Sequence, residues 1–390
     1  MDMSPRLLII SNRYPVGPDD VASPFVHDFR VALVEAGVSV EVVTPYYSSS
    51  SDNEGYLDES VHRFDWSDGG TVISQLPLTR PASYFKIWRY FRNGYRYASA
   101  LLHEKGYDGV LALWAMPSGY LAYRLHRSFG IPYAVWALGS DINSWAQKPV
   151  VGKLVETILR EADRCYADGY ELAEKTAALC GKPCDFLPSM HRIDVSKTID
   201  APKEKHFICV GRVEQEKGVF DLLDAFEIFM KYHQDWKLSF VGTGRAEDEL
   251  QAAVVRRELE NNVTVYGYCE RDTINRLLSR ATAAVIPSHS DSLPLTFGEA
   301  MQAGLPVICS DIGDMPRLID KYNVGMHFPV GEIDRLADCL DRIIIEGPAL
   351  QGNCPRVLAE LDISNAARRV RTWLDGRRET QEEMTDAFNR

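Results

Sequence analysis

Apolar runs without polar alternation recur along this chain, and segments with helical periodicity separate them. One series consists of RLLIIS, VSVEVVT, GVLALW, YAVWAL and RCYAD, and a second consists of HFICVG, KLSFVG, VTVYG, AAVIPS and LPVICS. Such runs are typical of strands in a parallel sheet, because helices cover both of its faces. The alternation predicts an α/β fold with two doubly wound, Rossmann-like domains.

The gap between the two series indicates the domain boundaries. A chain of 390 residues is long for a single core, and the polar stretch PSMHRIDVSKTIDAPKEK separates the series. We predict an N-terminal domain at 1–190, a linker at 191–205, a C-terminal domain at 206–365 and a final helix or tail at 366–390. Ligands of such sheets bind beyond the carboxyl ends of the strands, so functional residues are expected in a deep cleft between facing domains.

The apolar runs and the cysteines bear on where the protein works. The N-terminal stretch MDMSPRLLIISNRYP holds only a five-residue apolar run, which is too short for the core of a signal peptide. No run approaches the roughly 20 residues that span a bilayer. The eight cysteines lack paired CxxC spacing, which is typical of reduced thiols. We therefore expect a cytoplasmic protein without a metal site.

The charge is unevenly distributed. A net charge of −12 argues against a general nucleic-acid binder, yet residues 77–160 hold 11 Lys and Arg against 4 Asp and Glu. In the basic stretch at 80–105, cations interleave with Phe85, Trp88 and Phe91. Two interpretations stay open: a helix that lies on an anionic membrane, or an amphipathic helix that packs its aromatic side chains on a sheet.

Two turns that follow strands of the second series are candidates for ligand binding. In VGRVEQEKG, the cations Arg212 and Lys217 precede a helix, an arrangement that suits an anion, although surface cations at a turn would look alike. In FVGTGRAEDEL, Gly242 permits a tight turn, but Glu247 occupies the third glycine position of a dinucleotide fingerprint. The second turn is therefore predicted to line the cleft without binding a nicotinamide cofactor.

The stretch SHSDSLPLTFGEAMQAG carries two acids eight residues apart. Asp291 lies in a loop after a strand, and Glu299 lies at the start of a helical run. Carboxylates accept hydrogen bonds from sugar or ribose hydroxyls, and the backbone N–H groups of Leu295 and Thr296 can point at phosphate oxygens. Coincidental spacing is the competing explanation for the two acids.

The motifs GRVEQEKG, VGTGRAEDEL and SHSDSLPLTFGEAMQAGLPVICSDIGDMPRLI follow one another in the order and spacing of a known family. The chain resembles retaining glycosyltransferases of the GT-B fold, family four, strongly over residues 205–345. The N-terminal half resembles them more weakly, through LLIISNRYP, HDFRVALVEAGVSVEVVTP and ALGSDI.

The resemblance implies roles for the donor-side residues. Arg212 and Lys217 would neutralise the diphosphate of a nucleotide sugar. Asp291 stands at the first Glu of the family's E-x7-E motif, which contacts donor-sugar hydroxyls, and it is one methylene shorter than that Glu. Glu299 stands at the second Glu and would hold the ribose hydroxyls.

Further substrate-binding roles follow from the same resemblance. The backbone at Leu295 and Thr296 would meet the phosphate, and Tyr268 and Cys269 would lie beside the base. Gly242 is assigned to this substrate-binding set with them.

On the acceptor side, Gly139, Ser140 and Asp141 match the family's GSD loop, which faces the donor sugar and the acceptor. The family often has a His before GSD where this chain has Leu138, which is compatible with a donor sugar that lacks the hydroxyl contacted by that His. The residue types leave Asp141 two roles, an acceptor-side polar group or an N-cap of the following INSWAQ segment.

The implied mechanism assigns catalytic roles to Asp141, Arg212, Lys217 and Asp291. The cations would stabilise charge on the departing diphosphate in place of a metal, and the chain has no D-x-D pattern. No cofactor is expected besides the nucleotide sugar as donor substrate. The same-face attack that retains configuration would use the leaving phosphate to help deprotonate the acceptor.

The expected function is sugar transfer to a glycan or lipid-linked acceptor in surface polysaccharide or glycolipid synthesis. The expected partners are the nucleotide sugar, the acceptor and an anionic membrane, at whose cytoplasmic face the protein would work. The alternatives are a soluble enzyme acting on a small acceptor, a catalytically inactive protein that binds a nucleotide sugar, and a GT-B epimerase.

Overall fold

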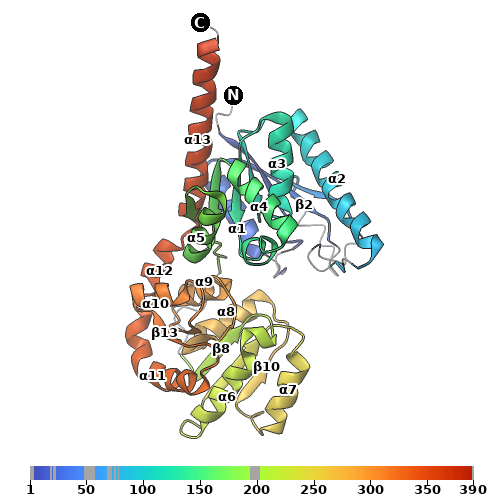
Figure 1. Ribbon diagram of the computed structural model, residues 1–390. Coiled ribbons are helices and arrows are strands. Elements are labelled where there is room, and N and C mark those ends of the chain that lie inside the picture. The colour runs from blue at the N-terminus through green and yellow to red at the C-terminus, as the bar shows by residue number, and fades with distance from the viewer. Residues whose placement is uncertain are drawn as a thin grey trace. The chain divides into compact units, whose positions relative to one another are not determined.

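A computed structural model describes residues 4–17, 20, 23–47, 58–67, 73, 76–77, 79–193 and 203–388, the side chains of 379–388 excepted. The chain forms two compact units (Figure 1). Unit 1 comprises Met1–Ser189 and Ile363–Arg390, and unit 2 comprises Met190–Asp362. Most of the predicted linker, residues 194–202, lies outside the described residues.

Unit 1 is built on a parallel sheet of seven strands in the order β3-β2-β1-β4-β5-β6-β7. Its strands are β1 (Arg6–Ser11), β2 (Ser39–Pro45), β3 (Val61–Phe64), β4 (Gly109–Leu113), β5 (Tyr133–Ala137), β6 (Arg164–Ala167) and β7 (Cys184–Phe186). In the central register, Ile9 of β1 pairs with Val42 of β2 and with Leu111 of β4. All three side chains are fully buried, as expected for strands covered on both faces.

Helices cover both faces of this sheet. They are α1 (Pro24–Glu35), α2 (Pro81–Glu104), α3 (Ser118–Phe129), α4 (Pro149–Glu161), α5 (Tyr170–Cys180) and α13 (Ile363–Phe388), with a short π-helical turn, η3 (Asp141–Trp145). One face packs against α2, α3, α4 and α5 in a single apolar cluster. On the other face, Phe29 of α1 packs against Trp136 of β5 with 4.8 Å between ring centroids.

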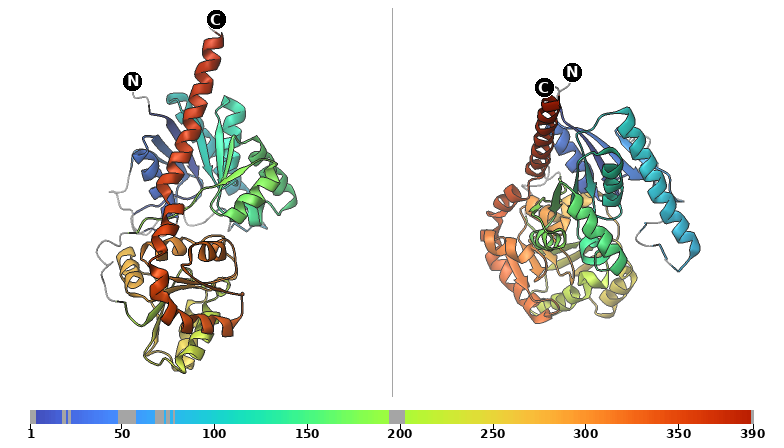
Figure 2. Two further views of the ribbon diagram at one scale, coloured as in Figure 1. Left: turned by 90° about the vertical axis from the view of Figure 1, so that its left-hand side faces the viewer. Right: turned by 45° about the horizontal axis from the view of Figure 1, so that its top comes forward.

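The final helix, α13, belongs to unit 1 although it follows unit 2 in the sequence. It packs beside α1, and Figure 2 shows it running along unit 1 on the side opposite α2. Arg369 donates a hydrogen bond to the carbonyl of Phe186 at 2.7 Å, and Arg377 forms an ion pair with Asp163. A Cβ added to Gly109 would lie 2.8 Å from the Trp373 ring, which shows how closely α13 approaches β4.

The basic stretch predicted at 80–105 forms α2 and divides its aromatic side chains between two faces. Tyr90 is buried, and Phe91 and Tyr95 pack against the unit 1 core. Phe85 and Trp88, in contrast, are 61% and 54% exposed and stack on each other with ring centroids 5.7 Å apart. The packing interpretation therefore holds for Tyr90, Phe91 and Tyr95, and membrane contact by the exposed face stays a prediction.

Unit 2 is built on a parallel sheet of six strands in the order β10-β9-β8-β11-β12-β13. These strands are β8 (His206–Val210), β9 (Lys237–Val241), β10 (Val263–Val265), β11 (Ala283–Ile286), β12 (Val307–Ser310) and β13 (Gly325–Phe328). The strand order reverses between β8 and β11, which are neighbours in the sheet. In doubly wound sheets, the carboxyl edge at such a switch point is the usual ligand site.

The helices of unit 2 are also divided between two faces. They are α6 (Val219–Met230), α7 (Glu247–Arg256), α8 (Arg271–Arg280), α9 (Leu295–Gln302), α10 (Met315–Tyr322), α11 (Ile333–Gln351) and α12 (Cys354–Glu360), with a 3-10 turn, η4 (Gln215–Lys217). The cluster formed by α6, α7 and α11 includes Phe226, Leu250 and Leu340, all fully buried. On the other face, α9 packs against α12. The two units together confirm the predicted α/β class with two doubly wound domains.

Among the described residues, no helix is both long and apolar enough to cross a membrane.

Candidate active site

The turn after β8 carries the two predicted cations, and the structure places them differently. Lys217 ends η4, and its Nζ lies 2.7 Å from both carboxylate oxygens of Asp291. The two side chains are 19% and 17% exposed, so the pair is largely shielded from solvent. Arg212 is mostly exposed and forms an ion pair with Glu214 at 2.8 Å. Lys217 and Asp291 therefore form a pair, while the side chain of Arg212 remains exposed and accessible to a ligand.

The loop that bears Asp291 is held against the β8 turn by backbone contacts. The N–H of His289 donates to the carbonyl of Glu216 in the β8 turn at 2.9 Å. A second contact holds the loop to the segment after β12, where the N–H of Asp314 donates to the carbonyl of Ser292 at 3.0 Å. Gly218 has a φ of +66°, and a Cβ there would lie 1.9 Å from the carbonyl oxygen of Pro287. Only glycine permits this approach, which brings Lys217 within reach of Asp291.

The glycine turn after β9 supports the same edge of the sheet. Gly242 has a φ of +133°, and a Cβ there would lie 2.0 Å from the carbonyl oxygen of Gly211. The turn therefore packs directly against the loop that leads to Arg212. This contact requires glycine at position 242 for packing alone, so the residue needs no role in dinucleotide binding. Gly242 therefore supports the loop that carries Arg212.

Helix α9 presents its N-terminus next to this loop. Leu295 and Thr296 are its first residues after the N-cap, Pro294, so their N–H groups lack acceptors within the helix. The hydroxyl of Thr296 donates to the carbonyl of Val210 at 3.1 Å, which ties α9 to the end of β8. The two amides therefore lie at the carboxyl edge of the central strands, where an anion would be favoured.

Glu299 lies one turn further along α9. Burial raises the pKa of its carboxyl group above the ordinary value, and the charges of His191 and Arg271 act in the opposite direction. Among the described residues, no side chain or backbone group makes a hydrogen bond or ion pair with this carboxylate. A shielded carboxylate without such a partner is suited to accept hydrogen bonds from ligand hydroxyls.

The residues predicted beside the base lie in the loop after β10, at the same edge of the sheet. Tyr268 is exposed and Cys269 is partly exposed. Gly242 donates its N–H to the carbonyl of Gly267 at 2.9 Å, which connects this loop to the β9 turn. An exposed tyrosine ring at this position can stack on a flat ligand group.

In unit 1, the predicted GSD loop follows β5. Gly139 adopts a φ of +98° and Ser140 is exposed. Asp141, by contrast, is 0% exposed. Its carboxylate accepts N–H bonds from Ala115 at 2.7 Å, Ile142 at 3.1 Å and Leu138 at 3.2 Å.

These contacts make Asp141 the internal support of its loop. It is the first residue of η3, and the N-cap position belongs to Ser140, so the predicted N-cap role was placed one residue too late. Burial raises the pKa of Asp141 to about 6, although the backbone N–H bonds lower it. With its carboxylate enclosed by amides, Asp141 can act on an acceptor only through the loop that it shapes.

Sequence reasoning did not single out His191, Arg271 or Gln302 near Glu299. His191 lies in the polar stretch that was interpreted as a linker, and a polar segment without periodicity carries no local signal for a contact with a distant helix. Among the described residues, no group of three or more His, Cys, Asp or Glu is placed to hold a metal ion.

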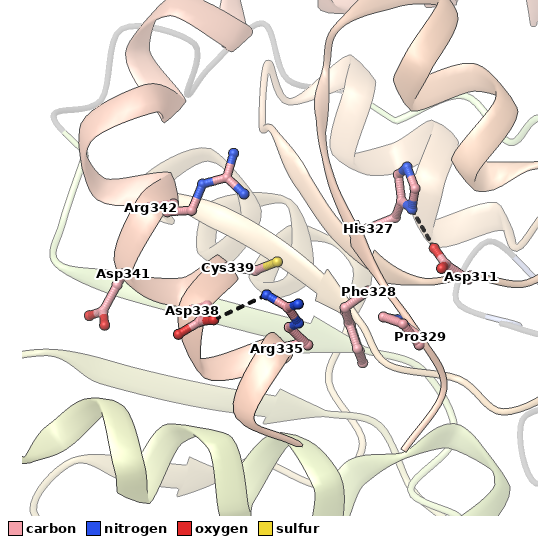
Figure 3. A pocket seen from close by; sticks show the side chains of 9 residues that line it. All are labelled: Asp311, His327, Phe328, Pro329, Arg335, Asp338, Cys339, Asp341 and Arg342. Atoms are coloured by element: carbon pink, nitrogen blue, oxygen red, sulfur yellow. Dashed lines mark hydrogen bonds and ion pairs between the residues drawn. The ribbon is translucent and has the colours of Figure 1, made fainter. Parts of the chain in front are cut away.

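A separate cavity of about 510 Å³ lies at the ends of β12 and β13 (Figure 3). Its lining comprises Asp311, His327, Phe328, Pro329, Arg335, Asp338, Cys339, Asp341 and Arg342. None of these is a predicted site residue. His327 joins Asp311 to Asp320 by hydrogen bonds from its two ring nitrogens. Burial lowers the pKa of His327, but the two carboxylates outweigh burial and raise it above 6.5.

Comparison with known proteins finds a family match within the C-terminal half of the chain and several glycosyltransferase relatives. Residues 192–354 match the family Glycosyl transferases group 1. The chain is 28% identical over 340 residues to the teichuronic acid biosynthesis glycosyltransferase TuaC of Bacillus subtilis, which covers 81% of this chain and 84% of that one. It is 26% identical over 288 residues to the 2-deoxystreptamine glucosyltransferase of Streptomyces kanamyceticus, covering 67% of this chain and 70% of that one.

A solved structure with the same two-unit architecture is that of Anabaena HepE in complex with UDP. Its TM-score is 0.71 at 15% identity, and the match covers 95% of this chain and 100% of that chain. At this identity the likeness concerns the fold. The matched residues 192–354 include Lys217, Asp291 and Glu299, so the similarity to the group 1 glycosyl transferases covers the candidate site of unit 2. Together with the relatives named above, these findings make the chain a glycosyltransferase with the GT-B fold.

Proposed function

We propose that this protein transfers a sugar from a nucleotide-diphosphate sugar to a glycan or lipid-linked acceptor, with retention of configuration and without a metal. The observation that carries the proposal is the pair of Lys217 and Asp291, which joins the loops after β8 and β11 just before α9, the helix that bears Glu299. There a cation would face the diphosphate and two carboxylates would face hydroxyl groups.

The donor would lie across the switch point of the unit 2 sheet. Lys217, Arg212 and the free N–H groups of Leu295 and Thr296 would bind the diphosphate, and Glu299 would accept hydrogen bonds from the ribose. The presence of UDP in the Anabaena HepE structure supports a uridine nucleotide as the first to test.

The chemical step would depend on charge stabilisation at the leaving group. As the bond to the sugar breaks, negative charge grows on the outer phosphate, and Lys217 and Arg212 would be positioned to stabilise it. Asp291 would then have to share Lys217 with the donor while it orients the sugar hydroxyls. The departing phosphate would take the acceptor proton on the same face of the sugar, which retains the configuration.

The exposed face of α2 favours an acceptor at a membrane. Phe85 and Trp88 form an aromatic pair, and the guanidinium of Arg92 lies 5.1 Å from the Trp88 ring centroid. Aromatic side chains next to cations suit the interface of an anionic bilayer. Surface polysaccharide or glycolipid synthesis at the cytoplasmic membrane face is therefore the acceptor context that we propose, in line with the name of the TuaC relative.

A small soluble acceptor is the second candidate, and the name of the 2-deoxystreptamine glucosyltransferase relative supports it. The two candidates differ in their requirement for α2. Binding to anionic vesicles, with transfer stimulated by them, would favour the lipid-linked acceptor, whereas vesicle-independent transfer would favour the small one.

The test of the donor site is a thermal-shift screen with UDP, GDP, ADP and their common sugars. A ligand at about 100 times its Kd stabilises the folded protein by roughly 2.7 kcal/mol, so one nucleotide should stand out. Transfer or hydrolysis of the matching sugar would show catalysis. Binding without either reaction would indicate an inactive nucleotide-sugar-binding protein, and no binding to any nucleotide would contradict the proposal.

A further inference from the structure

The loop after β1 lies where the strand order of the unit 1 sheet reverses. Strand β1 pairs with β2 on one side and with β4 on the other. The carboxyl edge at such a switch point is the usual ligand site of a doubly wound sheet. Because β1 ends at Ser11, Arg13 lies at this edge, two residues beyond the strand.

Side chains from two other elements hold the backbone of this loop. Arg63 of β3 donates a hydrogen bond to the carbonyl of Pro15 at 2.6 Å. The hydroxyl of Tyr14 forms a hydrogen bond with Nδ1 of His27 on α1 at 2.9 Å. These contacts fix the backbone from which the side chain of Arg13 extends.

The guanidinium of Arg13 is well placed but poorly paired. Its central carbon lies 4.8 Å from the ring centroid of Tyr47, a cation–π contact. The carboxylate of Asp20 lies 3.8 Å away, which is close enough for an ion pair and too far for a hydrogen bond. Within the described part of the chain, the guanidinium donates no hydrogen bond, although its Nε is buried. The hydroxyl of Tyr47 is also buried without a hydrogen-bond partner there.

This arrangement indicates a ligand for Arg13. A guanidinium has five N–H donors, and buried donors are normally satisfied in folded proteins. Arg63, which lies beside the same loop, follows that rule by donating to two backbone carbonyls. The side chain of Arg13 is 28% exposed, so a ligand can reach it. The planar fork of a guanidinium matches the two oxygens of a carboxylate or a phosphate.

We propose that the carboxyl edge of the unit 1 sheet binds an anionic group of the acceptor, a carboxylate or a phosphate, through the guanidinium of Arg13 stacked on Tyr47. A neutral acceptor would leave these donors unpaired, so the site would select acidic or phosphorylated acceptors. That the anion belongs to an acceptor rests on the proposed function. That Arg13 binds an anion does not, because it follows from the contacts within unit 1.

The first experiment measures anion binding without any nucleotide. Protein labelled with ¹⁵N at the arginine Nε is titrated by NMR with D-glucuronate, inorganic phosphate or D-glucose, and the Arg13 signal is assigned by its loss in Arg13→Gln. The two anions should shift this signal in a saturable way. D-glucose, the neutral counterpart of D-glucuronate, should leave it in place. Binding of D-glucuronate, followed on the signals of the ligand, should weaken about tenfold or more in Arg13→Gln.

Two further variants control this measurement. Arg13→Lys keeps the charge but not the fork, so its loss of affinity should be smaller, and it serves if Arg13→Gln does not fold. Arg160→Gln removes an exposed arginine that is paired with Glu156 on α4, and it should bind D-glucuronate as the unaltered protein does. An Arg13 signal that responds to neither anion, or equal affinity in Arg13→Gln and the unaltered protein, would overturn the proposal.

The second experiment separates this inference from the proposed donor site. The Kd for UDP should be the same in Arg13→Gln and the unaltered protein, because the donor is proposed to bind unit 2. Weaker UDP binding in Arg13→Gln would mean that Arg13 meets the donor diphosphate, which overturns its acceptor role. If the anions shift the Arg13 signal but no nucleotide binds, the proposed function fails and the anion site stands. If UDP binds and neither anion acts on Arg13, the proposed function stands and this inference fails.

Discussion

Lys217 Nζ contacts both carboxylate oxygens of Asp291 at 2.7 Å. The cation proposed to bind the diphosphate and the acid proposed to bind the sugar hydroxyls therefore form one ion pair. The pair spans 74 residues of sequence and joins the β8 turn to the loop after β11. In the absence of a donor, the charge of Lys217 is balanced by Asp291. A diphosphate would have to compete with that carboxylate for the ammonium group.

This competition separates the effects of two substitutions on nucleotide binding. Lys217→Met should weaken UDP binding about 10- to 100-fold, because a hydrogen bond to a charged group contributes about 1.5–3 kcal/mol. Asp291→Asn should leave UDP binding unchanged or tighten it, since Lys217 is released, while sugar transfer falls. Calorimetric Kd values and transfer rates test both.

A matched control for this prediction is Lys205→Met. Lys205 also pairs with an aspartate, Asp235, but both side chains are mostly exposed. This variant should bind UDP as the unaltered protein does. Equal losses in the Asp291 and Lys217 variants would show that the two residues act as a structural pair and not as opposed ligands.

The exposed aromatic pair on α2 predicts membrane binding. Phe85→Ser and Trp88→Ser should each weaken binding to phosphatidylglycerol vesicles about tenfold or more, since burying a large apolar side chain contributes about 1.5–3 kcal/mol. Co-sedimentation with phosphatidylglycerol and phosphatidylcholine vesicles measures the effect. Tyr232→Ser, which removes a highly exposed aromatic side chain from unit 2, is the control. Loss of binding in the control, or retention of binding in both α2 variants, would argue against this surface.

The enclosed carboxylate of Asp141 predicts a pH-dependent stability effect. Asp141→Asn should destabilise unit 1 by about 1–3 kcal/mol, because an amide group cannot accept all the N–H bonds that the carboxylate accepts. With the pKa of Asp141 raised from 3.8 to about 6, the folded protein binds this proton more tightly than the unfolded chain. The contribution of Asp141 to stability therefore falls as pH rises from 3.8 through about 6.

Asparagine does not titrate in this range. The loss of unfolding free energy caused by Asp141→Asn should therefore be larger at pH 5 than at pH 7. Urea unfolding at the two pH values measures it, with Asp185→Asn, an exposed aspartate of β7, as the control. A smaller loss of unfolding free energy at pH 5 than at pH 7 would mean that the backbone N–H bonds outweigh burial and lower the pKa of Asp141.

The His327 bridge beside the cavity of Figure 3 predicts a second pH effect. Because the pKa of His327 is raised above 6.5 in the folded protein, the bridge stabilises unit 2 fully below pH 6.5 and less as pH rises through the folded-state value. His327→Gln should therefore lower the Tm more at pH 6 than at pH 8.5. Calorimetry tests this, with His103→Gln on α2 as the control, and an equal loss at both pH values would exclude the ionic contribution.

The central strands could be predicted from sequence because they are apolar on both faces, as RLLIIS in β1 and HFICV in β8 show. The edge strands β3, β7 and β13 were missed. Their sequences are VHRF, CDF and GMHF, and each is short and includes a polar or small residue. An edge strand has one neighbour and partial solvent exposure, so no local pattern requires it to be apolar.

The candidate site likewise has a part that could be predicted from sequence and a part that could not. The sequence by itself determined the two-domain α/β class and the candidate positions Arg212, Lys217, Asp291 and Glu299, because turns after strands and the starts of helices are local properties. Only the tertiary structure decided that Lys217 meets Asp291, that Asp141 is enclosed and that α13 returns to unit 1. Each of these joins segments that are distant in sequence or buries a polar group, and such contacts depend on how whole layers pack rather than on the residues beside them.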